Sequence, residues 1–214
     1  MRIVITLLLA FVSLPLVAQH PRMVLIEEGT NASCEPCASQ NPTFESFLQR
    51  DDVAPYVIPL IYHAFWPGHD TMNVIAPEMH DARVRGYYGM IGMPTTVVNG
   101  HYYRSETPGL GASSPADTQA IRSRIDSMRA TTSPILITIS DSIDGDQLTV
   151  ATTVSSAQAL SHRLRIAIVE RHHYYPYPTA GNNGEEHFHW IVRAMLPDTA
   201  GRTLSLNAGN SATF

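Results

Sequence analysis

Residues 24–42 read VLIEEGTNASCEPCASQNP, and the rest of the chain is best interpreted outward from them. An apolar run that ends in two acids and meets Gly, Thr and Asn is typical of a buried strand and the turn that closes it. Beyond Cys34, apolar side chains recur at helical spacing, with Ser33 placed as the N-cap and Pro36 tolerated in the first turn. The stretch therefore predicts a strand, a turn and a helix whose first turn carries Cys34 and Cys37.

The position of this cysteine pair indicates thiol chemistry. A thiolate in the first turn of a helix faces unpaired backbone N–H groups and the positive end of the helix dipole, which lower its pKa. Cys34 would be that nucleophile, and Cys37, one turn on, could attack a mixed disulfide formed at Cys34. A bridge across so short a loop restricts the unfolded chain little, so a purely structural disulfide is the weaker interpretation.

Two metal-based interpretations of the same pair are less favoured. A zinc site needs four ligands and would have to recruit histidines, because the chain holds only two cysteines. Haem attachment at this motif is excluded, since Ala38 follows Cys37 where a histidine is required.

Downstream, the pattern continues with alternating strands and helices. Residues 56–63 form a β-rich run in which Pro59 indicates an irregular or edge strand. A helix is expected to start near Pro77 and to stop at Gly89, and Pro42 is expected to kink the helix that follows the cysteines.

Residues 91–100 then read as a turn into a β-branched strand that closes with Asn-Gly, so that residues 101–104 can pair back as a hairpin. A capping signature at residues 114–117 begins a third helix with Ile121, Ile125 and Met128 on one face. The expected order is β-α-β-α-β-β-α.

Residues 24–42 resemble the active-site region of the thioredoxin superfamily. That family has a buried acid six residues before the first cysteine, which Glu28 matches, and a proline five residues after the second cysteine, which Pro42 matches. It also has a cis-proline loop before its third strand, which Met93, Pro94 and Thr95 match. The resemblance covers roughly residues 21–131 and implies a thioredoxin-like α/β domain.

The resemblance also implies roles for individual residues. Cys34 would attack, Cys37 would resolve, and Glu28 would move the proton, with Glu27 as the alternative if the strand register slips by one. Pro94 would shield the dithiol as a cis proline, and Thr95 and Met93 would bind the backbone of the substrate.

More narrowly, the chain resembles exported, outer-membrane-associated thioredoxin-like proteins of Bacteroidetes-type bacteria, which join a thioredoxin domain to a C-terminal β domain. The matching segments are residues 66–70, 87–94 and 183–193. The chain departs from thioredoxins proper where Ser33 replaces a tryptophan and Glu35 a glycine, and it contains no lysine. A carboxylate beside Cys34 opposes thiolate formation, so the direction of exchange is left unassigned.

The periodicity changes to two from Ser133 onward, which places a domain boundary near residue 132. Residues 19–132 are expected to form the thioredoxin-like domain and residues 133–214 a small all-β, Ig-like sandwich. Such a sandwich usually needs about 100 residues, so either it is small or the chain is truncated.

The N-terminus and the charge bear on location and partners. Met1 and Arg2 precede an apolar run, which predicts a secretory signal peptide over residues 1–18 rather than a buried strand or helix. All 14 basic residues are arginines against 19 acids, and the net charge of −5 excludes a basic face for nucleic acid. The protein is therefore expected to be exported, either to the periplasm or to the outer membrane as a peripheral protein.

Histidines form the remaining pattern. His172 and His173, together with His187 and His189, could converge on Zn or Cu, but surface histidines beside a loop are the favoured interpretation. No metal and no cofactor are predicted.

The sequence thus predicts an exported thiol–disulfide oxidoreductase acting on protein thiols and disulfides, with an envelope protein as redox partner. The alternative is a non-catalytic structural or binding protein of the outer envelope that keeps the scaffold and a stable disulfide.

Overall fold

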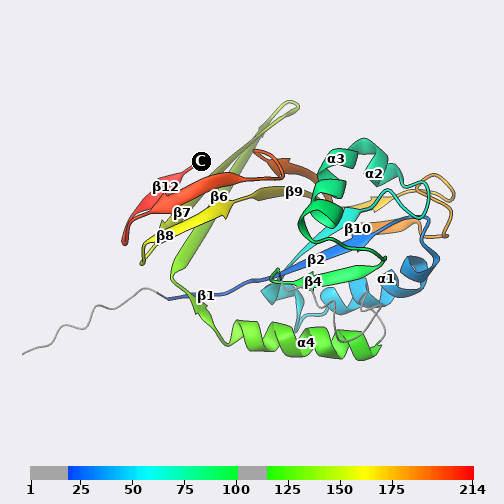
Figure 1. Cartoon of the computed structure of the whole chain (residues 1–214), viewed down its shortest axis with the longest axis horizontal. Helices are drawn as coiled ribbons and strands as arrows, with labels where there is room; N and C mark the ends of the chain where they lie inside the picture. Colours follow the sequence, from blue (N-terminus) through cyan, green and yellow to red (C-terminus); the bar gives the residue numbers. More distant parts are fainter. Residues whose placement is uncertain (1–18, 101–114) are drawn as a thin grey trace, which may run out of the picture.

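A five-stranded mixed sheet organises the protein in the computed structural model, which describes residues 19–100 and 115–214. Its strand order is β4-β2-β3-β10-β9 (Figure 1). β2 pairs in parallel with β3 and β3 with β10, whereas β4 and β9 run antiparallel to their neighbours. The strands are β2 Val24–Thr30, β3 Val57–His63, β4 Thr95–Val98, β9 Ile166–Tyr174 and β10 His187–Leu196.

Helices cover both faces of this sheet (Figure 1). α1 (Glu35–Leu48) and α4 (Pro115–Arg129) lie on one face. On the other lie α3 (Pro77–Asp81) and the π-helical η2 (Ala82–Tyr87). The short α2 (Thr71–Ile75) packs its Met72 with Phe188 and Ile191 of β10, and the 3-10 turn η1 (Ala54–Tyr56) leads into β3. No helix in the described part of the chain combines the length and the apolar character needed to cross a membrane.

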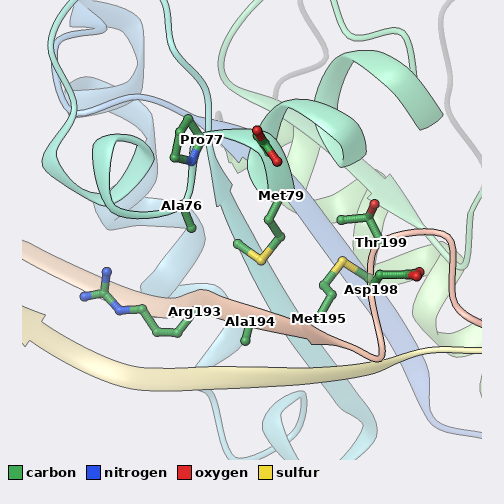
Figure 2. A pocket seen from close by; sticks show the side chains of 9 residues that line it. Ala76, Pro77, Met79, Arg193, Ala194, Met195, Asp198 and Thr199 are labelled. Atoms are coloured by element: carbon green, nitrogen blue, oxygen red, sulfur yellow. The ribbon is translucent and has the colours of Figure 1, made fainter.

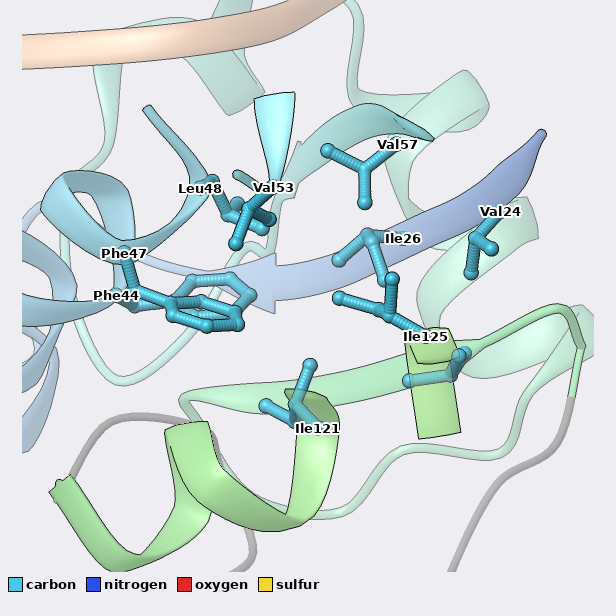
Figure 3. Close-up of a cluster of buried hydrophobic side chains, with 10 residues drawn as sticks. Val24, Ile26, Phe44, Phe47, Leu48, Val53, Val57, Ile121 and Ile125 are labelled. Atoms are coloured by element: carbon cyan, nitrogen blue, oxygen red, sulfur yellow. The ribbon is translucent and has the colours of Figure 1, made fainter. Parts of the chain in front are cut away.

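The main hydrophobic core lies between the sheet and α1 with α4 (Figure 3). Phe44 and Leu48 project from α1 onto Ile26 of β2, and Ile121 and Ile125 close the core from α4. The helical stripes expected from the sequence are thereby confirmed.

The remaining strands gather at one end of the molecule (Figure 1). They form a three-stranded sheet β12-β7-β6, a pair β11-β8 and a short pair β1-β5. Their bounds are β1 His20–Pro21, β5 Thr132–Ser133, β6 Ile135–Asp144, β7 Gln147–Ser156, β8 Leu160–Leu164, β11 Arg202–Leu206 and β12 Ser211–Thr213.

The expected boundary near residue 132 does not separate two independent sheets. β9 and β10, which were assigned to a separate Ig-like sandwich, complete the sheet that contains β2 and β3. Ile191 and Val192 are adjacent in β10 and both fully buried, so this strand is apolar toward both faces of the sheet. Such a strand fits the interior of a helix-covered sheet, a pairing that period-two alternation alone cannot identify.

Two local expectations also need correction. Pro59 does not mark an edge strand, because β3 lies between β2 and β10. The β10 pairing is at Ile61, and Pro59 itself is paired with Ile26 of β2. The expected helix start at Pro77 is confirmed by α3, but the helix continues into the π-helical η2 and ends at Tyr87, and a further short helix, α2, capped by Asp70, precedes it. Pro42 lies inside α1, which runs on to Leu48.

Three expectations lie outside the described residues. They are the signal peptide over residues 1–18, the hairpin strand at residues 101–104, and the start of the capping signature at residue 114.

Candidate functional site

Cys34 and Cys37 form a disulfide at the N-terminus of α1, with their Cα atoms 5.2 Å apart. Cys34 itself is the N-cap, and its Sγ accepts a hydrogen bond from the backbone N–H of Cys37 at 3.2 Å. Ser33 is therefore not the cap that the sequence indicated. Its hydroxyl instead donates to the carbonyl of His69 at 2.5 Å and accepts from the backbone N–H of Asn182 at 3.2 Å, while Asn31 closes the turn before Cys34.

Both cysteines are shielded in this oxidised form. Cys34 is 2% exposed and Cys37 is fully buried. Sulfur at this position faces the N–H groups of the first helical turn, so a thiolate generated there would be stabilised.

A cis-proline loop lies against the dithiol. The Met93–Pro94 peptide bond is cis, and Cys34 Sγ lies 3.6 Å from the carbonyl oxygen of Met93. Thr95 begins β4 directly afterwards. Gly29 of β2 packs against two methionine side chains of this region: a Cβ there would lie 2.6 Å from the sulfur of Met90 and 3.0 Å from that of Met93. The structure thus brings Met93, next to Pro94, into contact with Cys34.

Glu28 is buried on the α1 side of β2. It is 2% exposed, and its Oε1 has no hydrogen-bond partner within residues 19–100 and 115–214. Burial raises its pKa well above the ordinary value, and the nearby carboxyls of Glu45 and Glu185 add to the effect. A carboxyl whose pKa is raised toward that of a thiol can exchange a proton with it.

Glu27, the alternative proton acceptor, lies on the opposite face of β2. Its carboxylate is bound by Arg83 through two hydrogen bonds of 2.8 and 3.0 Å, and it also accepts one from Tyr88. Because neighbouring residues of a strand point to opposite faces, only Glu28 shares a face with α1. Glu27 is therefore committed to a buried ion pair.

The sequence did not indicate the loop between β9 and β10, residues 175–186, as part of this site. The backbone N–H of its Asn183 donates to the carbonyl of Ala32 at 3.1 Å, and the side-chain amide donates to the carbonyls of Cys34 at 3.1 Å and Asn31 at 3.4 Å. Gly181 packs so closely that a Cβ would lie 2.2 Å from the oxygen of Ala32. The partners are about 150 positions apart along the chain, which no local pattern reveals.

Asp70 holds the same turn from the other side. Its carboxylate accepts from the backbone N–H of Ala32 at 2.7 Å and pairs with His63 at 2.8 Å. Burial works to raise its pKa, but His63 and the backbone donors outweigh burial and hold the pKa below its usual value. Behind this pair, burial lowers the pKa of His80 to about 3. Asp70 belongs to the segment 66–70 that the sequence analysis noted for its family resemblance only.

The histidines of β9 and β10 gather on the sheet edge. His172 and His187 lie 3.0 Å apart between ring nitrogens, and His189 pairs with Glu45 at 2.9 Å. Within the described part of the chain, no group of three or more His, Cys, Asp or Glu side chains is arranged to hold a metal ion.

A separate pocket of about 570 Å³ lies between α3 and β10 (Figure 2). Met79 and Met195 point toward each other across it. None of the site residues expected from the sequence lines it, so it is distinct from the dithiol.

Comparison with known proteins gives structural likeness without sequence matches. No protein-family model and no curated protein matches the chain. Two solved structures resemble it.

The first is HBP35 of Porphyromonas gingivalis, with a TM-score of 0.72 and 19% identity, covering 91% of this chain and 63% of that chain. The chain thus spans less than two thirds of HBP35. The second is a protein from Agrobacterium tumefaciens, with a TM-score of 0.56 and 17% identity, covering 92% of this chain and 78% of that chain. At these identities the likeness shows a shared mixed α/β fold.

Proposed function

We propose that the protein is an exported thiol–disulfide oxidoreductase of thioredoxin-like type that acts on protein thiols and disulfides. The observation that carries the proposal is the arrangement around Cys34: a disulfide at a helix N-terminus, the carbonyl of Met93 at 3.6 Å, and a buried acid, Glu28, on the same side of β2. The likeness to HBP35, from a Bacteroidetes species, supports an exported thioredoxin-like protein.

In the reducing direction, the Cys34 thiolate attacks one sulfur of a substrate disulfide and expels the other as a thiolate, which takes a proton. The carboxylate form of Glu28, made more basic by burial, then takes the proton of Cys37, and the Cys37 thiolate attacks the Cys34 sulfur of the mixed disulfide. This step expels the second substrate sulfur and forms the Cys34–Cys37 bond. Two electrons move from the protein to the substrate, and oxidation of a substrate dithiol runs the same steps backward.

The cis-proline loop provides the docking position for the substrate. Met93 and Thr95 flank Pro94 at the start of β4, where an extended substrate chain would lie beside Cys34. Peripheral association with the outer membrane and a redox partner in the envelope belong to the same proposal.

A second candidate function is a non-catalytic envelope protein with a stable bridge. The 2% exposure of Cys34 favours it, because an attacking thiol must be reached by its substrate.

Trapping distinguishes the two. Cys37→Ser, mixed with a fluorescent disulfide-bonded peptide, is expected to form a covalent mixed disulfide at Cys34, and Cys34→Ser is the control that cannot. Turnover of the same peptide by the wild-type protein is expected with a thiol reductant present. Absence of both trapping and turnover would leave the stable-bridge function.

A further inference from the structure

Glu185 is a carboxyl that the proposed exchange steps do not use, yet it is tied to the dithiol turn. Its Oε2 accepts from the side-chain amide of Asn183 at 2.5 Å, and its Oε1 accepts from that of Asn41 at 2.9 Å. Asn41 lies four residues after Cys37 on α1 and is buried. Both carboxyl oxygens are thus fixed by neutral donors.

One side-chain nitrogen joins Glu185 to the first turn of α1. The amide of Asn183 that binds Glu185 also donates to the carbonyl of Cys34 at 3.1 Å. That carbonyl in turn accepts the backbone N–H groups of Cys37 at 3.1 Å and Ala38 at 3.2 Å. The carboxyl is therefore linked through one side-chain amide to the carbonyl of Cys34 in the first turn of α1.

The surroundings of Glu185 offer little positive charge. The titratable groups that face it are Glu28 of β2, Glu45 of α1, Asp70 at the start of α2, and His63 of β3, of which only His63 can become cationic. Burial raises the pKa of Glu185, while the Asn183 and Asn41 amides oppose the rise. The two amides donate to both carboxyl oxygens and so favour the ionised form, whereas a glutamine would fill the same volume without a charge.

We propose that Glu185 sets the redox balance of the dithiol: its carboxylate opposes the Cys34 thiolate and holds the Cys34–Cys37 pair toward a more reducing potential. The inference rests on the proposed exchange function. Reduction converts a neutral disulfide into thiols, one of which ionises, so negative charge nearby disfavours the reduced form and raises the thiol pKa. Asn183 is a positioning residue that keeps the carboxylate at this turn.

The test is an equilibrium with glutathione, in which two glutathione thiols reduce the disulfide and give two cysteine thiols and one glutathione disulfide. Glu185→Gln is expected to favour the reduced protein about tenfold, a rise of about 30 mV in potential, with a lower Cys34 pKa. The shift is expected to vanish at acidic pH, where Glu185 is protonated, and to grow as pH rises.

Glu186→Gln is the matched control, because Glu186 binds the N–H of Tyr177 at 2.8 Å, away from the cysteine turn. It is expected to change the equilibrium less than threefold. If Glu185→Gln does not fold, Asn183→Ala, which frees the carboxylate from the turn, is expected to shift the potential in the same direction.

An equilibrium constant for Glu185→Gln within threefold of wild type across pH 5–9 would overturn the inference. The proposed function fails separately, through absence of peptide turnover by the wild-type protein, because the equilibrium can be measured without turnover.

Discussion

The two faces of β2 treat neighbouring glutamates in opposite ways. Glu27 and Glu28 are adjacent and both buried, but Glu27 meets Arg83 and Tyr88 while Glu28 has an oxygen without a partner among the described residues. Burial without a cationic partner raises the pKa of Glu28, whereas the Arg83 guanidinium offsets the cost of burying the Glu27 carboxylate.

The comparison separates stability from chemistry. On the η2 face, Glu27 stabilises the fold through its ion pair with Arg83. On the α1 face, Glu28 can gain or lose a proton near the dithiol. If this is right, disrupting the first face should cost folding free energy, and disrupting the second should cost activity while it relieves the fold.

The largest effect is expected for Arg83→Leu. It leaves Glu27 buried without its cation, which should lower the free energy of unfolding by about 3–5 kcal/mol. Urea denaturation at pH 7 measures this. Arg50→Ala, which removes an exposed pair with Asp52, is the control and should lower the free energy of unfolding far less, because solvent screens this pair. If both variants lowered the free energy of unfolding equally, the buried Arg83–Glu27 pair would stabilise the fold no more than an exposed pair.

Gly181→Ala tests the support of the cysteine turn on the α1 side. Its Cβ would lie 2.2 Å from the backbone oxygen of Ala32, which cannot move without displacing the turn, so a loss of about 1–3 kcal/mol is expected. Gly92→Ala meets no atom within 4 Å and should stay within about 0.5 kcal/mol of wild type by thermal unfolding. A neutral Gly181→Ala would show that the loop between β9 and β10 does not clamp the turn.

Glu28→Gln probes the unpaired acid through pH. In the wild-type protein the folded pKa of Glu28 lies above its unfolded value of 4.5. As pH rises from the unfolded pKa to the folded pKa, the unfolded state releases a proton that the folded state keeps. The free energy of unfolding therefore falls by up to about 1.4 kcal/mol per pH unit in this range.

The glutamine variant lacks this slope. It should match the wild type at pH 4 and exceed it by about 1 kcal/mol or more at pH 7, while the rate of disulfide exchange drops about 100-fold. Urea titrations at the two pH values and peptide turnover provide the readouts. A stability difference that is the same at both pH values would show that Glu28 is not titrating.

The smallest effect is expected in the strands away from this sheet. Ile139 of β6 is 63% exposed, so Ile139→Thr should change the free energy of unfolding by less than about 0.5 kcal/mol. Ile125→Thr, at a fully buried position of α4, is the matched substitution and should cost several times more. A large cost at Ile139 would mean that β6 is covered by packing that its exposure does not show.

Local signals in the sequence were sufficient for the dithiol and its nearest partners. The strand, turn and helix around Cys34 follow from one continuous stretch, residues 24–48. Met93–Pro94 is recognisable because a proline directly precedes a β-branched strand. The spacing of Ile121 and Ile125 likewise predicts the apolar face of α4, and both side chains are buried.

What the sequence did not reveal depends on pairing between distant segments. β10 pairs with β3, and Asn183 binds Cys34, across separations of more than a hundred residues. Period-two alternation predicts that a strand exists but does not indicate which strand it pairs with. Ser33 was a reasonable cap by residue type, but the turn closed by Asn31 shifts the start of α1 by one residue.

The reduction potential of the Cys34–Cys37 pair in the wild-type protein tests the central claim most directly, with Cys34→Ser as the control that cannot form the bridge. Equilibration in glutathione buffers is expected to give a value between about −270 and −120 mV, the range of known exchange catalysts. A value below about −300 mV would contradict an exchange function and indicate a structural bridge.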